Sequence, residues 1–438
     1  MNKLVSVGFA RKCITPPLGT AISGYFEPRH AKGVHDELYV SATAFDDGKN
    51  RAVVLACDLC GMKNQYLLDG YKKMISEFCN IPAEAVIVTC SHTHTGPIVG
   101  DDESSGEKSN PAYDEYLGLM LRDAAAMAFA DASPARFYTA EGKCRDVAFV
   151  RIYRMRDGSV QTNPPLGDKD ILHPISEADE TVYILKITRE GKEDILLVNF
   201  GVHADTIGGE IISADHMGFM RETLENALPD TKAVFLQGAE GDINTRNVHI
   251  MKVLRGIEYS RSIGRSIAGA VLAALGDAEE IEVSDVAYAA MHISIPTNRE
   301  NHRIPLAEKV LALHRAERDN EIDALCGDTP MNPPEAIRIL RLADGPDAFE
   351  FTLSAIKLGN IAIAGLPGEP FCEIGKRVRN ASPFDKTFVC VLTDGGETYF
   401  PTGNVYEERC YESTSTPIKK GADDILVNSM TKLLNNLR

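Results

Sequence analysis

The chain has 438 residues, of which 44% are hydrophobic and 25% are charged, so we expect a large apolar core rather than disorder. Sixty-three acidic side chains against 46 basic ones give a formal net charge of −17. This charge repels phosphate backbones and anionic membrane surfaces. We therefore expect neither nucleic acid nor a lipid surface as a partner.

No stretch of the sequence approaches the roughly 20 apolar residues of a membrane span. The apolar run near the start is broken at Arg11 and Lys12, so neither an anchor nor a secretory signal is predicted. Ten cysteines lie mostly inside apolar runs, which is typical of reduced thiols in a core and favours a cytoplasmic protein. Cys57 and Cys60 form a C-x-x-C without a second pair, and we interpret them as the end of a buried strand.

The first half of the chain alternates short β-rich runs with helical stretches. Strands are expected at 51–59 and 84–90, and helices at 64–79 and 112–132. This alternation is typical of an α/β protein.

In the second half, several apolar runs end in glycine and polar residues, which is typical of strands that deliver side chains at their carboxyl ends. These runs are 194–206, 232–247 and 360–371. Helices are expected at 251–276 and 305–326, and strands at 283–297 and 349–359. No internal repeat, Pro-rich linker or charge block is visible. We therefore predict mixed β-sheets flanked by helices, in a single catalytic domain over residues 1–438.

The stretch VTCSHTHTGP, residues 88–97, places two histidines two positions apart after a β-rich run. In extended backbone both imidazoles would face the same side, whereas the following Gly96 and Pro97 would separate them. By itself the pair leaves three interpretations open: one shared metal ion, two catalytic roles, or a structural turn.

Two further polar residues close apolar runs. His203 ends the run NFGVH, and Glu369 follows Leu-Pro-Gly after a buried-looking strand. A carboxylate there must be solvated, paired or bound to a metal. Alternatively, Glu369 is a first-turn acid stabilised by the dipole of a helix that starts there. The motifs of serine hydrolases, zincins, P-loop enzymes and dinucleotide-binding folds are absent, which argues against those classes.

Several segments of the chain, taken in order, resemble the motif series of the neutral/alkaline non-lysosomal ceramidase family. The similar segments are ITPPLGTAISGY, GVHDELYVSATAF, SHTHTGP, NFGVHADT, ISADHMGF, FLQGAEGDIN, AGLPGE and YFPTGNVYEERCYESTST. They extend from about residue 7 to about residue 418, nearly the whole chain. The resemblance implies a ceramidase-type catalytic domain.

The resemblance further implies one zinc ion and hydrolysis of an amide bond. The implied ligands are His92, His203, Glu369 and Tyr399. Zinc accepts imidazole nitrogen and carboxylate oxygen, and it lowers the pKa of a bound water to roughly 7. The implied reaction is attack of this water on the carbonyl carbon.

By the same resemblance, His94, Arg151 and Tyr411 contact the substrate and stabilise the charge that develops on its carbonyl oxygen. Asn244 departs from the family pattern, because the ceramide-cleaving members carry a serine at this place in G-D-x-S-P-N. An amide cannot act as an alcohol nucleophile, but it can orient water or a carbonyl. The departure favours direct attack by metal-bound water.

The ceramidases of this family also carry a C-terminal β-sandwich domain, and this chain ends about where their catalytic domain ends. We therefore expect a small or medium soluble amide as substrate, and a zinc-dependent amidohydrolase as the function. The alternatives are an esterase or lactonase at the same zinc site, a true ceramidase (N-acylsphingosine amidohydrolase), and an inactive binding protein on this scaffold. The sequence leaves the oligomeric state and the metal bound in the cell open.

Overall fold

The computed structural model describes residues 5–101, 105–327, 331–396 and 398–438. Within these ranges one strand-pairing pattern occurs three times. A first strand pairs antiparallel with a second, the second antiparallel with a third, and the third parallel with a fourth. One helix connects the third strand to the fourth, and a longer helix follows later.

The three units occupy successive parts of the chain. The first consists of β1 (Ser6–Cys13), β3 (Tyr39–Asp46), β4 (Arg51–Cys57), α1 (Gln65–Cys79), β5 (Val86–Cys90) and α2 (Pro111–Ala130). The second consists of β6 (Ser133–Lys143), β11 (Thr181–Arg189), β12 (Asp194–Phe200), α3 (Asp215–Ala227), β14 (Thr231–Gln237) and α4 (Ile257–Ala274). The third consists of β17 (Val286–Pro296), β18 (Ala348–Leu358), β19 (Ile361–Gly365), α8 (Cys372–Ala381), β21 (Lys386–Cys390) and α10 (Ala422–Leu437).

No internal repeat in the sequence corresponds to this repeated topology. Strand order and burial can be kept by many apolar sequences of suitable volume, so related topology does not require related residues. The expected α/β fold with mixed sheets is confirmed. A single domain over the whole chain stays a prediction.

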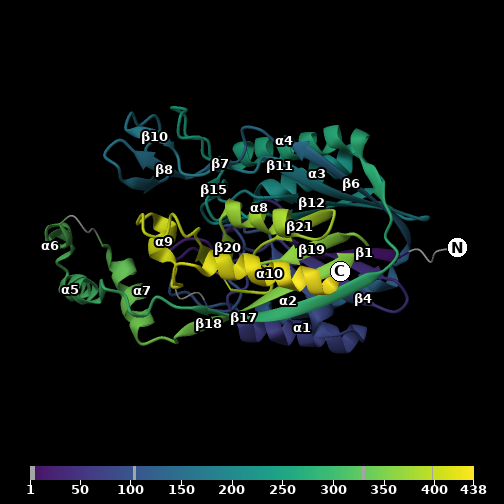
Figure 1. Ribbon diagram of the computed structural model, residues 1–438, viewed down its shortest axis with the longest axis horizontal. Helices are drawn as coiled ribbons and strands as arrows, with labels where there is room; N and C mark the ends of the chain where they lie inside the picture. Colours follow the sequence, from purple (N-terminus) through teal and green to yellow (C-terminus); the bar gives the residue numbers. More distant parts are fainter. Residues whose placement is uncertain (1–4, 102–104, 328–330, 397) are drawn as a thin grey trace.

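The first two units form one nine-stranded sheet, joined by two residue pairs between β1 and β6 and including β16 (Glu279–Ile281). The third unit forms a separate four-stranded sheet. In Figure 1, α3 and α4 lie on one side of the molecule and α1 and α2 on the opposite side, with the strands between them. None of the described helices has the length and apolar character that a membrane crossing requires.

The fourth strands of the three units approach one another. The backbone N–H of Val391, after β21, donates to the carbonyl of Gln237 at the end of β14. The N–H of Asp394 donates to the carbonyl of Val88 in β5. The carboxyl ends of the three parallel pairs therefore meet, and the residues that follow them lie close together.

Capping residues and apolar periodicity explain the helices of this framework. The side chain of Asn64 caps α1 by accepting from the backbone N–H of Leu67 at 3.1 Å. The helix expected at 251–276 begins only at Ile257, because Gly256 has φ +86°. The helix expected at 305–326 is interrupted and forms α5 (Ile304–Arg315) and α6 (Ile322–Cys326).

A helical insertion separates β17 from β18 and consists of α5, α6 and α7 (Pro333–Ala343). It projects from one end of the molecule, at the left of Figure 1. Its own small apolar cluster is distinct from the two large clusters beneath the sheets. The other elements are β2 (Gly33–Val34), β7 (Phe149–Val150), β8 (Ile152–Met155), β9 (Val160–Thr162), β10 (Ile171–Pro174), β13 (Ile211–Ile212), β15 (Ile243–Asn244), β20 (Glu369–Pro370), β22 (Tyr399–Phe400) and α9 (Tyr411–Ser415).

Candidate metal centre

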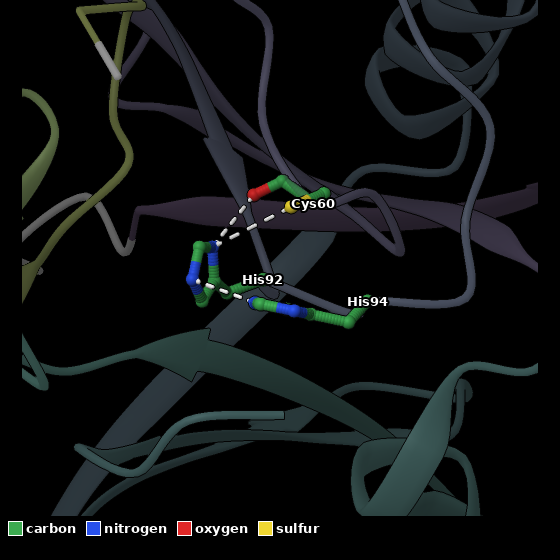
Figure 2. A group of neighbouring side chains, drawn as sticks. All are labelled: Cys60, His92 and His94. Atoms are coloured by element: carbon green, nitrogen blue, oxygen red, sulfur yellow. Dashed lines mark hydrogen bonds between the residues drawn. The ribbon is translucent and has the colours of Figure 1, made fainter. Parts of the chain in front are cut away.

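His92 follows β5 and is buried, but its backbone is not extended. Its φ of +66° is left-handed, which turns the chain immediately after the strand. The ring Nδ1 lies 3.0 Å from the carbonyl oxygen of Cys60 and 3.9 Å from the Cys60 sulfur (Figure 2). Because a carbonyl only accepts, Nδ1 carries a proton, and Nε2 presents a lone pair to the site when the ring is neutral.

His203 follows β12 and repeats this arrangement. Its Nδ1 lies 3.1 Å from the carbonyl oxygen of Glu240, so its Nε2 also presents a lone pair. The Nε2 atoms of His92 and His203 are 3.2 Å apart. Burial opposes protonation of His92, but the Glu369 charge raises the pKa of His92 well above its usual value, so in the absence of metal His92 carries a second proton. A cation between the two nitrogens would take the place of that proton.

Glu369 brings a carboxylate to the same point. Its Oε2 lies 3.4 Å from His92 Nε2 and 3.3 Å from His203 Nε2, and this buried atom accepts no hydrogen bond from any residue that the structure describes. Glu369 lies on β20, whereas α8 begins three residues later at Cys372, so it is not a first-turn acid of that helix. Gly241 permits this approach, since a Cβ there would lie 2.3 Å from the Glu369 carbonyl oxygen.

Glu240 is a candidate ligand that the sequence analysis missed. It is fully buried, and neither carboxylate oxygen has a hydrogen-bond partner among the described residues. Its ligand atom lies within 4.8 Å of those of His92, His203 and Glu369. The available signal was position: Glu240 stands three residues after the end of β14, as His203 does after β12.

The electrostatics of this cluster fit a divalent cation. Burial raises the pKa of Glu240 well above its usual range. Burial also opposes ionisation of Glu369, but the charge of His92 outweighs it and lowers the pKa of Glu369 well below its usual range. Burial and the Arg151 charge lower the pKa of His203 to about 4, so this imidazole is neutral. Neutral imidazole nitrogens and carboxylate oxygens are the ligands that zinc accepts.

His94 lies in the same cluster rather than apart from it. Its Nε2 is 3.2 Å from His92 Nε2, and the rings are nearly perpendicular (Figure 2). Burial, followed by the charge of His92, lowers the pKa of His94 well below its usual value. The ring packs against Gly24, where a Cβ would lie 2.6 Å from the His94 ring.

Arg151 is held at the edge of the cluster by two partners. Its Nε forms a buried ion pair with Glu412 at 2.6 Å, and its Nη2 donates to the carbonyl of Gly241 at 2.7 Å. Its Nη1 remains directed at the centre, 3.4 Å from His203 Nε2. The role of Arg151 toward substrate stays a prediction.

The two tyrosines form a wall beside the cluster. Tyr399 pairs directly across from Glu369 in the parallel β20–β22 ladder, and its ring lies 5.2 Å from the Arg151 guanidinium. Burial and the Glu369 charge raise the pKa of Tyr399 well above its usual value. Tyr411 begins α9, with its ring 5.7 Å from that of Tyr399. Tyr399 is thus adjacent to the cluster, and its role as a ligand stays a prediction.

Asn244 belongs to the lining of a neighbouring cavity. Its Oδ1 accepts from the backbone N–H of Thr245 at 2.6 Å, so this oxygen is used within its own loop. The residue lines a cavity of about 320 Å³ together with Asp205. Asp205 in turn lies 3.9 Å from His94 Nδ1, which places this cavity next to the cluster.

No protein-family model matches the chain. Among solved structures, the neutral ceramidase from Pseudomonas aeruginosa is similar with a TM-score of 0.75 and 16% identity, over 100% of this chain and 75% of that one. A ceramidase complexed with C2 is similar with a TM-score of 0.74 and 16% identity, over 99% of this chain and 75% of that one. At this identity the likeness shows the fold alone. The chain therefore has the neutral ceramidase fold, with a histidine and carboxylate cluster buried at its strand ends.

Proposed function

We propose that this protein is a zinc-dependent hydrolase that cleaves a non-peptide amide bond in a small or medium soluble substrate. One observation carries the proposal: two imidazoles and two buried carboxylates converge with their ligand atoms within 4.8 Å of one another. The neutral ceramidase fold supports it. The ten free cysteines support a reducing compartment such as the cytoplasm.

His92, His203 and Glu369 would hold the zinc, with Tyr399 or Glu240 completing the set. Zinc bound there supplies a Lewis acid and acidifies water for attack on a carbonyl. The chain contributes orientation, because the carbonyls of Cys60 and Glu240 fix both imidazoles in the tautomer that exposes Nε2.

His94, Arg151 and Tyr411 would bind the substrate carbonyl. Neutral His94 has a buried Nδ1 that bonds to none of the residues described by the structure, so the ring has capacity to donate. The partners of Arg151 hold its guanidinium in place before substrate arrives. Donors that are already oriented cost little reorganisation when charge develops on the oxygen.

The proposal is tested on purified protein by metal analysis and by kinetics on matched amides and esters. We expect about one zinc per chain, loss of turnover on chelation, its return with zinc, and a higher kcat/KM for amides. A preference for esters or lactones would replace the amidase by the esterase alternative, and efficient ceramide cleavage would identify a true ceramidase. A zinc-loaded protein without turnover on any panel would support the binding-protein alternative.

A further inference from the structure

A large cavity lies between the helical insertion and the segment around α9. Its volume is about 1140 Å³, and its walls include α7, the segment around α9, and Phe26. The Phe26 ring lies 6.5 Å from that of Tyr411, which lies 5.7 Å from that of Tyr399. A row of three aromatic rings therefore joins this cavity to the cluster.

The charged side chains that line this cavity are mostly basic, whereas the chain as a whole is acidic. Its described lining residues include six basic and two acidic side chains, although the chain carries a net charge of −17. The basic residues are Arg303, Arg338, Arg341, Arg409, Lys419 and Lys420. Both acids are already paired, Glu335 with Arg303 and Arg409, and Glu407 with Lys420. Arg338 and Lys419 lie outside these pairs, and the sum of the charges over the described lining residues is positive.

Arg338 is the cation of this lining that faces the aromatic row. It is half-buried on α7, and its guanidinium lies 6.0 Å from the centre of the Phe26 ring. Its Nε is buried and has no hydrogen-bond partner in the described part of the chain, and none of the carboxylates there forms an ion pair with Arg338. Burial lowers the pKa of this guanidinium, which reflects the cost of holding the charge there. An anionic ligand would offset that cost.

We propose that this cavity is a subsite for a carboxylate or phosphate at the end of the substrate remote from the scissile bond, with Arg338 as the main contact. The inference rests on the proposed function and narrows its substrate class to anionic amides. The planar guanidinium can bind two oxygens of such a group through parallel hydrogen bonds. The rings of Phe26 and Tyr411 would contact the apolar part between the two groups.

Kinetics on matched substrates test the subsite. One series of probes consists of mono-p-nitroanilides of linear dicarboxylic acids of increasing length, with analogues in which a methyl group or a phosphate replaces the free carboxylate. The second series consists of N-acetyl ω-amino acids with matched N-acetyl alkylamines. We expect the wild type to prefer an anionic member over its neutral analogue about 10- to 100-fold in kcat/KM, mainly through KM. Arg338→Gln should reduce that ratio to about 1. The carboxylate and phosphate series identify which anion is preferred.

The matched control is Arg318→Gln, which removes an exposed cation of the same insertion that pairs with Glu321. It should keep the wild-type ratio, and equal melting temperatures should show that both variants fold. An equal rate for anionic and neutral members in the wild type, unchanged by Arg338→Gln, would overturn the subsite.

A binding measurement separates failure of the subsite from failure of the proposed function. Fluorescence titrations compare dansylglycine with neutral dansylglycinamide on metal-free protein, so that the carboxylate has no zinc to bind. We expect Arg338→Gln to weaken dansylglycine binding about tenfold or more, and not to change dansylglycinamide. If no amide is hydrolysed but this weakening occurs, the subsite stands and the amidase proposal fails. If amides are hydrolysed but binding is unchanged, the subsite is wrong.

Discussion

The two sides of the candidate site are built differently. The cluster side consists of residues that directly follow core strands, and His92, His203, Glu240 and Glu369 are all buried. The opposite side is the helical insertion, which packs on its own small apolar cluster, and α9 lies at the boundary between the two sides. Residues at strand ends inherit their positions from the sheets, whereas an insertion can change without disturbing them. The candidate metal centre therefore belongs to the fold, and under the proposed subsite the choice of substrate would belong to the insertion.

The largest effect is expected on the cluster side. Glu369→Gln removes the anionic oxygen beside both Nε2 atoms, so zinc affinity should fall by more than about 100-fold, with loss of detectable turnover. Competition with a fluorescent chelator measures the affinity. The exposed His173→Ala is the control and should bind zinc normally. Full zinc affinity in Glu369→Gln would show that this carboxylate is not a ligand.

Among these variants, loss of the Glu412 charge should have the largest effect on stability. Arg151 and Glu412 are both buried, and removing one charge of a buried pair leaves the other uncompensated. Glu412→Gln should lower the free energy of unfolding by about 3 kcal/mol, measured by urea denaturation. Glu321→Gln, in the exposed pair of the insertion, should leave the midpoint unchanged. Similar midpoints for both variants would contradict the assigned contrast between the two sides.

Tyr411 stands at the boundary between the two sides, with its side chain 39% exposed. If its hydroxyl donates to the reacting carbonyl, Tyr411→Phe should lower kcat by about 10- to 100-fold while zinc affinity stays unchanged. Tyr66→Phe, which alters an exposed tyrosine of α1, is the control. A change in KM alone would move Tyr411 from the reaction to substrate binding.

Asn244 should give the smallest effect. Its Oδ1 is occupied by the Thr245 N–H, and the residue lines the small cavity rather than the cluster. Asn244→Ala should reduce kcat/KM by about 2- to 10-fold, the range of a neutral hydrogen bond. Asn244→Ser should give no burst of product in single-turnover experiments. A burst would revive the serine-based mechanism that the sequence argues against.

Much of the framework could be predicted from local pattern. Apolar runs ending in polar residues indicated the strands that lead to His92, His203 and Glu369, because the spacing of apolar residues along a strand is visible in the local sequence. The left-handed backbone at His92 was not predicted, since the extended conformation was the better local guess for a residue after a strand. Glu240 was missed although it stands three residues after the end of an apolar run, as His203 does, because an acid between Ala239 and Gly241 is also typical of a surface turn.

The sequence by itself determined the types of donor, their order along the chain and the α/β class. Only the tertiary structure decided which ring nitrogens face the centre, because the carbonyls of Cys60 and Glu240 that fix them come from distant segments. It also joined three units with one topology and no visible sequence repeat, so that their strand ends meet. Convergence of this kind depends on long-range packing, which no local pattern in one sequence records.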